Sequence, residues 1–151
     1  MTICHERKLI FVHIPKNAGT SIIKAMGPEN MFMDGTIEDY KDHYKDYWDK
    51  YKKFTVIRDP IERFKSAYKF ARMKESNWFS SSEMEGLTKH VDYDICNEKN
   101  INEYASFLYE NPKRFNRWTI PQTFIISNKK KEIEIDYFVR FENLLEDLSK
   151  I

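Results

Sequence analysis

A short segment near the N-terminus carries residue types that bind anions. Residues 15–21 read PKNAGTS and directly follow the apolar run KLIFVHI. A glycine lets the backbone approach a ligand closely, and the unpaired backbone N–H groups that open a helix favour a negative charge. We therefore expect a phosphate or sulfate site at the end of a buried strand, formed by Lys16, Gly19, Thr20 and Ser21.

The spacing of this segment disfavours two common phosphate-binding motifs. A Walker A loop, G-x-x-x-x-G-K-[ST], places its lysine directly after the last glycine, whereas Lys16 precedes Gly19. A dinucleotide-binding fingerprint, G-x-G-x-x-G, does not occur in a chain that holds only 4 glycines. A plain strand-to-helix turn with a solvated lysine stays open as the alternative.

A second basic element lies further along the chain. In the segment VIRDPIERFKSAY, Arg58 ends an apolar run and Ser66 comes 8 residues later (66 − 58). A guanidinium is a planar, permanently charged fork that suits a phosphate, and a serine hydroxyl adds one more donor. We expect Arg58 and Ser66 to form a second anion site, although a capped helix start would also explain this segment.

The elements that would position these residues alternate between strands and helices. The apolar runs at 8–14 and 52–58 predict buried strands of a parallel sheet, with 122–127 and 135–139 as further strands. We expect helices over residues 20–26, 36–51, 59–73, 101–110 and 141–151. Capping boxes predict two of their starts, Thr36 with Asp39 and Asn100 with Glu103. Repeated tyrosines line one side of the helix over residues 36–51, and Ile61 belongs to the expected core face of the helix over residues 59–73. Residues 74–99 are polar and predict a loop region with a short helix. This alternation predicts one α/β domain over residues 1–151, with a central parallel sheet between two helical layers.

Composition limits the classes of partner. The 151 residues are enough for one hydrophobic core. Because 25 basic residues face 24 acidic ones, the net charge of +1 gives no global field that would recruit nucleic acid or an anionic membrane. No apolar run predicts a membrane span or an export signal. Cys4 and Cys96 lie far apart and predict free thiols in a reducing, cytoplasmic setting.

The two motifs together resemble a known enzyme family. HIPKNAGTSI followed by FTVIRDPIERFKSAY is similar to the signature elements of the sulfotransferases that use 3′-phosphoadenosine-5′-phosphosulfate (PAPS), in particular the carbohydrate, family 2 type. The segments RWTIPQTFII and DYFVRFENLLEDL extend the resemblance over most of the chain. It implies the P-loop-NTPase-like sulfotransferase fold, and transfer of a sulfuryl group from PAPS to an acceptor hydroxyl, expected on a carbohydrate, with release of PAP.

The resemblance also implies roles for individual residues. Lys16 would contact the bridging oxygen and the sulfuryl group, while Arg58 and Ser66 would hold the 3′-phosphate. The residues that would bind the 5′-phosphate, largely through backbone N–H groups, are Asn17, Ala18, Gly19, Thr20 and Ser21. No metal ion is implied, because the donor arrives activated and Lys16 and Arg58 can supply the positive charge.

In-line transfer also needs a base that takes the proton of the acceptor hydroxyl. His43 is our candidate, since similar family members often carry a histidine before the second strand and neutral imidazole titrates in a useful range. Packing against Tyr40 and Tyr47 is the structural alternative for His43. His13, beside the loop, is the second candidate, and a glutamate stays open.

The acceptor and the partners are less specified by the sequence. Trp118 and Gln122 resemble a family segment near the acceptor cleft, although a tryptophan before a strand also suits a core. We expect a small-molecule or glycan acceptor and no nucleic-acid or membrane partner, and leave a homo-oligomer open. Two other functions stay open: a nucleotide-dependent phosphotransferase, for which only Asp59 could serve a Mg²⁺ site, and a non-catalytic module that binds PAP or PAPS.

Overall fold

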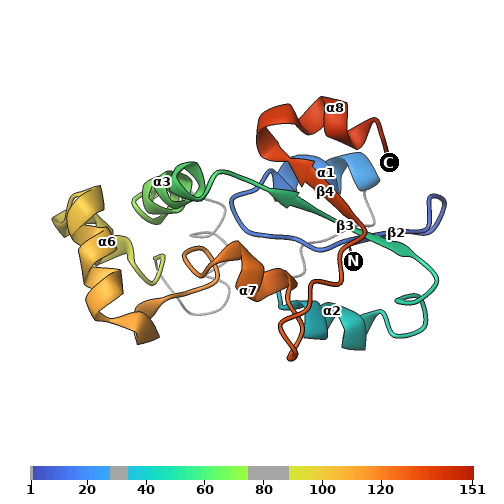
Figure 1. Cartoon of the computed structure of the whole chain (residues 1–151). Coiled ribbons are helices and arrows are strands. Elements are labelled where there is room, and N and C mark those ends of the chain that lie inside the picture. Colours follow the sequence, from blue (N-terminus) through green and yellow to red (C-terminus); the bar gives the residue numbers. More distant parts are fainter. Residues whose placement is uncertain (1, 28–33, 75–88) are drawn as a thin grey trace. The chain divides into compact units, whose positions relative to one another are not determined.

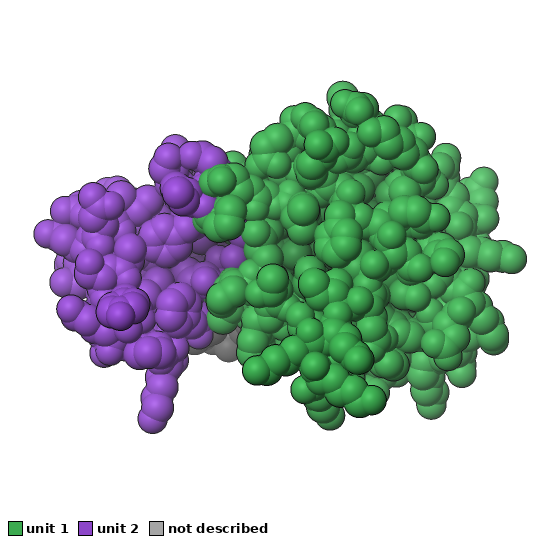
Figure 2. Space-filling view, viewed as in Figure 1, with its two compact units in different colours: residues 1–60, 120–151 green, residues 61–119 purple. Residues whose placement is uncertain are grey.

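The computed structural model describes residues 2–27, 34–74 and 89–151. They divide into two units (Figure 2): residues 1–60 with 120–151 form unit 1, and residues 61–119 form unit 2. Unit 1 therefore combines both ends of the chain, whereas unit 2 is one continuous segment. The single domain over residues 1–151 stays a prediction.

Unit 1 is built on a four-stranded sheet with the strand order β1-β2-β3-β4. The strands are β1 (Ile3–Cys4), β2 (Leu9–Phe11), β3 (Lys52–Ile57) and β4 (Tyr137–Arg140). The last three are parallel, as predicted, and Phe54 of β3 lies opposite Phe11 on one side and Tyr137 on the other. The sequence does not predict β1, which pairs antiparallel with β2, because a strand of two residues is too short to show a periodic pattern.

Helices cover both faces of this sheet (Figure 1). The helices are α1 (Gly19–Met26) and α8 (Leu144–Leu148) on one face, and α2 (Ile37–His43) and α7 (Gln122–Ile126) on the other. Successive residues of β2 alternate between them, so that Phe11 packs with α1 and Ile10 with α2. Both side chains are fully buried, and each stabilises the fold by roughly 1.5–3 kcal/mol. The predicted α/β fold, with a mostly parallel sheet between helices, is confirmed.

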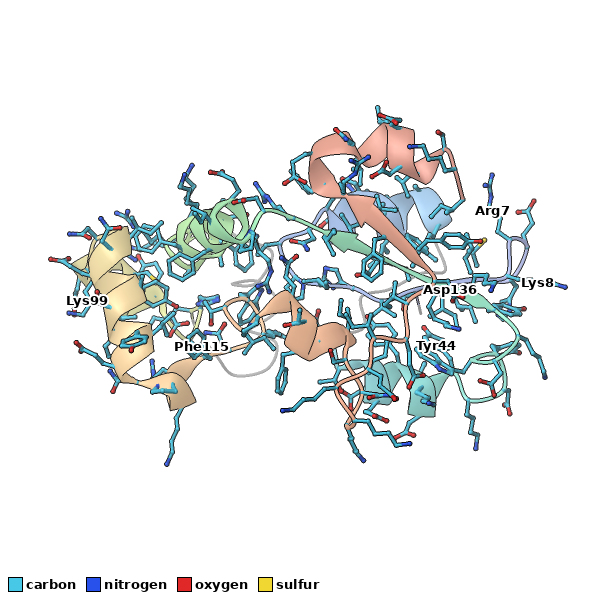
Figure 3. The ribbon with its side chains drawn as sticks, viewed as in Figure 1. Arg7, Lys8, Tyr44, Lys99, Phe115 and Asp136 are labelled. Carbon is cyan, nitrogen blue, oxygen red and sulfur yellow. The ribbon has the colours of Figure 1, made fainter. Side chains whose placement is uncertain are left out.

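Helix α2 is shorter than the helix predicted over residues 36–51. It ends at His43, and residues 44–50 continue as turns. The predicted capping box is confirmed, since Asp39 Oδ2 accepts from the backbone N–H of Thr36 at 2.6 Å. Tyr44, labelled in Figure 3, is buried beyond the helix, and its hydroxyl accepts from the backbone N–H of Thr2 at 2.6 Å. The repeated tyrosines thus do not form one continuous helix: Tyr40 and Tyr44 are buried in the core, and Tyr47 is 38% exposed.

The segment predicted as a strand over residues 122–127 is instead helix α7. A strand would send neighbouring residues to opposite faces, whereas Ile125 and Ile126 are both 3% exposed and Phe124 is 62% exposed. The helix follows Pro121, whose φ of −55° suits a helix start. A short apolar run of this kind does not distinguish strand from helix by its pattern, and packing on the sheet decides.

The amino ends of β3 and β4 are held together by one carboxylate. Asp136, labelled in Figure 3, accepts from the backbone N–H of Lys53 at 2.8 Å and from Lys52 Nζ at 3.0 Å. Because these strands are parallel, their carboxyl ends meet at the opposite edge of the sheet. The predicted closing helix after β4 consists of the 3₁₀ turn η2 (Phe141–Asn143) and α8.

Unit 2 is helical in its described part. Its elements are α3 (Pro60–Ala71), of which Pro60 belongs to unit 1, α5 (Tyr93–Glu98), α6 (Ile101–Glu110) and the 3₁₀ turn η1 (Pro112–Arg114). The predicted capping box of α6, Asn100 with Glu103, is confirmed. The expectation that Ile61 faces the core is wrong: Ile61 is 64% exposed, and Arg63 is the buried residue of that turn. Of the predicted loop at 74–99, residues 75–88 lie outside the described residues.

The cysteines, the helix lengths and the metal-binding residue types can each be compared with the sequence expectations. Cys4 and Cys96 are free thiols, as predicted. Among the helices that the structure describes, none has the length and apolar character needed to cross a membrane. Within the same described ranges, no group of three or more histidine, cysteine, aspartate or glutamate side chains is placed to hold a metal ion.

Candidate active site

The segment between β2 and α1 passes over the carboxyl edge of the sheet with an unusual backbone. Lys16 and Ala18 have φ values of 73° and 60°, in the left-handed region that residues other than glycine rarely adopt. Such residues cost free energy and cluster at ligand-binding loops, where the rest of the structure holds them. Left-handed turns of this type direct backbone N–H groups toward one point and form concavities for anions.

Helix α1 adds donors to the same loop. The backbone N–H groups of Ser21 and Ile22 bond to the carbonyl of Ala18 at 3.0 and 3.1 Å. Those of Gly19 and Thr20, the first two residues of α1, have no preceding helical carbonyl to pair with. Since the N-terminus of a helix is its positive end, these groups suit an anion. The loop residues that the sequence singles out are therefore brought together.

The imidazole of His13 packs directly against this loop. A Cβ atom added to Gly19 would lie 2.1 Å from His13 Nε2, so only glycine fits there without movement of the ring. The other ring nitrogen, Nδ1, lies 3.1 Å from Asp34 Oδ1, and the backbone N–H of His13 donates to the Tyr40 hydroxyl at 3.0 Å. His13, the second candidate base, is thus held in place by Asp34 and Tyr40 and lies against the loop at Gly19.

Arg58 connects the second predicted anion-binding element to the first. Its guanidinium Nη1 donates to the carbonyl oxygen of Lys16 at 3.1 Å. The same guanidinium lies over the ring of Phe141, 4.1 Å from its centroid, in a cation–π contact. Arg58 follows β3 and Phe141 follows β4, so the ends of three adjacent parallel strands supply this cluster.

Two amide side chains fill the space between these strand ends. Asn17 is fully buried, and its Nδ2 donates to the carbonyl of Val56 and to Gln122 Oε1, each at 2.7 Å. Gln122 Oε1 also accepts from the backbone N–H of Arg58 at 3.1 Å, and Gln122 Nε2 donates to the Arg58 carbonyl at 2.8 Å. Gln122, expected near the acceptor, is therefore bonded to both anion-binding elements.

Burial and the positive charge of Arg58 both change the pKa of Lys16. Burial, together with the nearby Arg58 guanidinium, lowers the pKa of Lys16 from its usual value to about 8. A cation is disfavoured where it loses water or meets a second cation. An anion placed between the two side chains would relieve that repulsion, and the site is therefore electrostatically suited to a negative ligand.

Three further predicted site residues have surroundings of their own. His43 is exposed at the end of α2, where its ring meets Tyr44 edge-on with 4.6 Å between centroids. Ser66 is a half-buried residue of α3 in unit 2. Trp118, also in unit 2, is 8% exposed and its ring lies 4.5 Å from that of His90. Their roles stay predictions.

Several residues of the site are not predicted from the sequence. Asp34, Phe141 and the carbonyl of Val56 enter the site through partners more than 20 positions away. Only Phe141 carries a signal, because it is the first residue of the helix predicted over residues 141–151 and lies two positions after a predicted strand. Arg140, its neighbour, pairs bidentately with Asp147 at 2.8 and 2.9 Å.

Asp59, the only acidic residue suggested for a magnesium site, donates its backbone N–H to Glu142 Oε1 at 3.0 Å. This contact joins the residue after Arg58 to the turn that follows β4. It places two carboxyl-bearing residues next to the Arg58 cluster without forming a set of three ligands among the residues described.

Comparison with known proteins gives one clear match. The model of the sulfotransferase family matches residues 1–151, the whole chain. No curated protein and no solved structure matches the chain significantly.

Proposed function

Because the chain belongs to the sulfotransferase family, whose enzymes are PAPS-dependent, we propose that the cluster around Lys16 and Arg58 binds the donor and that the acceptor is a carbohydrate hydroxyl. The observation that carries this proposal is the hydrogen bond of 3.1 Å between the Arg58 guanidinium and the Lys16 carbonyl. It makes one continuous site of two motifs that lie 42 positions apart.

The residues present fit an anionic donor. Two cations, the strained backbone at Lys16 and Ala18, and the N-terminus of α1 all favour negative charge. The lowered pKa of Lys16 supports the same conclusion, since the free site holds positive charge under repulsion. PAPS would supply a sulfuryl group that is already bonded to a good leaving phosphate.

Each residue then has a proposed task. Lys16 neutralises the charge that develops on the leaving phosphate, and the loop from Asn17 to Ser21 binds the 5′-phosphate through its backbone. Arg58 and Ser66 hold the 3′-phosphate. Such preorganised charge contributes about a hundredfold or more to the rate for each group.

The base remains a separate proposal. We keep His43, which is exposed and therefore accessible to an acceptor. His13 is the competitor, because it touches the loop at Gly19 and is paired with Asp34. A base must reach the acceptor hydroxyl directly or through one water molecule, and substitution of each histidine separates the two assignments.

The carbohydrate acceptor, with Trp118 as a contact, rests on the resemblance of RWTIPQTFII to the family. A reaction without a metal ion, a cytoplasmic location and the absence of nucleic-acid or membrane partners belong to the same proposal. Incubation with labelled PAPS and a panel of glycans, small alcohols, phenols and tyrosyl peptides tests the proposed acceptor class. We expect the label on a glycan; label on a peptide or phenol alone would overturn the acceptor class.

Donor binding is tested independently of transfer. PAP should raise the melting temperature without Mg²⁺, and ATP should do so much less, because a ligand stabilises the state that it binds and only PAP carries the 3′-phosphate. Arg58→Ala should abolish this difference, while Arg72→Ala, an arginine of unit 2 that contacts Tyr68, should keep it. Equal shifts with PAP and ATP in the unsubstituted protein would contradict donor binding at this site.

A further inference from the structure

The side chain of Gln122 joins the two anion-binding elements. We propose that it is a positioning residue of the donor site, which holds the loop and Arg58 in one arrangement without touching the donor itself. This inference rests on the proposed function, and it replaces the acceptor-binding role that the sequence suggests for Gln122.

Gln122 pairs with the backbone of Arg58. Its amide oxygen accepts from the Arg58 N–H at 3.1 Å, and its amide nitrogen donates to the Arg58 carbonyl at 2.8 Å. Strand β3 ends at Ile57, so Arg58 lies beyond the ladder. The side chain of Gln122 thus forms hydrogen bonds to both the N–H and the carbonyl group of Arg58, as the backbone of a neighbouring strand would. These bonds orient the residue that carries the guanidinium.

Gln122 also forms a hydrogen bond to the loop between β2 and α1. Its Oε1 also accepts from Asn17 Nδ2 at 2.7 Å. Asn17 lies between Lys16 and Ala18, the two residues with positive φ. Its other amide hydrogen bonds to the carbonyl of Val56 at 2.7 Å, and the residue is fully buried. A single oxygen atom of Gln122 therefore connects the strained loop to the backbone of Arg58.

Gln122 lies on a helix that is packed against the core. It is the first residue of α7, and the same helix buries Ile125 and Ile126 in the core beneath the sheet. The apolar packing of α7 thus fixes the position of the Gln122 side-chain amide relative to the strand ends. A site held by side chains on packed elements keeps its geometry better than one held by a loop alone.

The chemistry explains why an amide is needed. The position requires an acceptor for two N–H groups and a donor for one carbonyl, and only a group with both functions meets this requirement. Methionine has a similar length without these bonds and would leave the buried amide of Asn17 short of a partner. Glutamate retains the acceptor, loses the donor while it is ionised, and adds negative charge beside an anion site.

The central experiment measures PAP affinity, kcat and the KM of the acceptor for Gln122→Met. We expect PAP to bind at least about tenfold more weakly and kcat to fall, as loss of buried hydrogen bonds predicts, with the acceptor KM unchanged. Phe124→Ala is the matched control, because Phe124 is an exposed residue of the same helix. A raised acceptor KM with unchanged PAP affinity would overturn the proposal in favour of acceptor binding.

A second variant tests the amide chemistry and does not depend on Gln122→Met being stable. A protonated carboxyl group carries one donor and one acceptor, like an amide. The PAP affinity of Gln122→Glu, divided by that of the unsubstituted protein, should therefore recover as the pH falls from 7 to about 4, just below the ordinary glutamate pKa of about 4.3. A ratio that does not change with pH would count against the hydrogen-bonding role.

A double-mutant cycle tests whether Gln122 acts through Arg58. Gln122→Met should weaken PAP binding by less than about threefold when Arg58 is already alanine, since residues that act together are not additive. An equal loss in both backgrounds would contradict the coupling. If the unsubstituted protein binds PAP and Gln122→Met binds it equally well, only this inference fails; if the unsubstituted protein binds no PAP, the proposed function fails as well.

Discussion

The His13 imidazole and the Gly19 backbone are packed so closely that a Cβ atom on Gly19 would lie 2.1 Å from Nε2. Gly19 opens helix α1 at the anion-binding loop, and His13 follows strand β2. The requirement for glycine at this position therefore comes from a side chain of the preceding strand end and not from a left-handed backbone at Gly19.

Gly19→Ala should consequently weaken PAP binding through displacement of the loop or the ring. Overpacking of this kind costs about 1–3 kcal/mol, which predicts a loss of roughly five- to a hundredfold. In the background His13→Ala, the added methyl group has room, and the further loss should be less than about threefold. Titration calorimetry on the four proteins measures this. The same loss in both backgrounds would mean that His13 is not the obstacle.

Lys16→Met should have opposite effects on activity and on stability. Transfer should fall at least about a hundredfold, because a charge that stabilises the leaving group is lost. The free energy of unfolding should rise by about 1–2 kcal/mol at pH 7, since a partly buried cation with a lowered pKa is removed. Lys24→Met, at an exposed lysine in the last turn of α1, is the control and should change neither quantity. A destabilised Lys16→Met would contradict the electrostatic account.

The affinity for PAP should fall as the pH rises through about 8. The pKa of Lys16 is lowered to about 8 in the free protein, so its charge is present below that pH and lost above it. Binding of an anion favours the charged form, and we expect about tenfold weaker binding at pH 9.5 than at pH 7.5. Folding stability should change in the other direction, because the cost of burying the charge disappears as the pH rises from about 8 toward the unfolded value of 10.5.

Lys16→Arg provides the matched control for this pH dependence. A guanidinium stays charged over the whole range, so its PAP affinity should be nearly constant between pH 7.5 and pH 9.5. If the decline persists in Lys16→Arg, another group causes it.

His43→Ala should lower kcat at least about a hundredfold, as expected for loss of a general base, and leave PAP binding intact. His5→Ala is the control, since His5 is an exposed histidine that contacts Tyr51. A nearly normal rate for His43→Ala would remove it as the base. The rate of Asp34→Asn would then be decisive, because Asp34 is the partner of His13.

The local elements could be predicted where the pattern is long or a cap is explicit. The capping boxes at Thr36 and Asn100 and the two buried strands before Lys16 and Arg58 all agree with the structure. The prediction is wrong over residues 122–127, where a short apolar run forms a helix because Ile125 and Ile126 both pack on the sheet. It also makes α2 too long, since Tyr44, which is spaced for a helix, is buried from a turn, whereas Tyr47 is 38% exposed.

The sequence by itself determined the family, the parallel α/β fold, the loop that carries Lys16 and the second motif that carries Arg58, because each of these depends on residue types at close spacing along the chain. Only the tertiary structure decided that the Arg58 guanidinium reaches the carbonyl of Lys16, that His13 occupies the space beside Gly19, and that Gln122 connects both elements. These contacts join positions that are distant along the chain. They exist because parallel strands bring their carboxyl ends to one edge of a sheet, which no local pattern records.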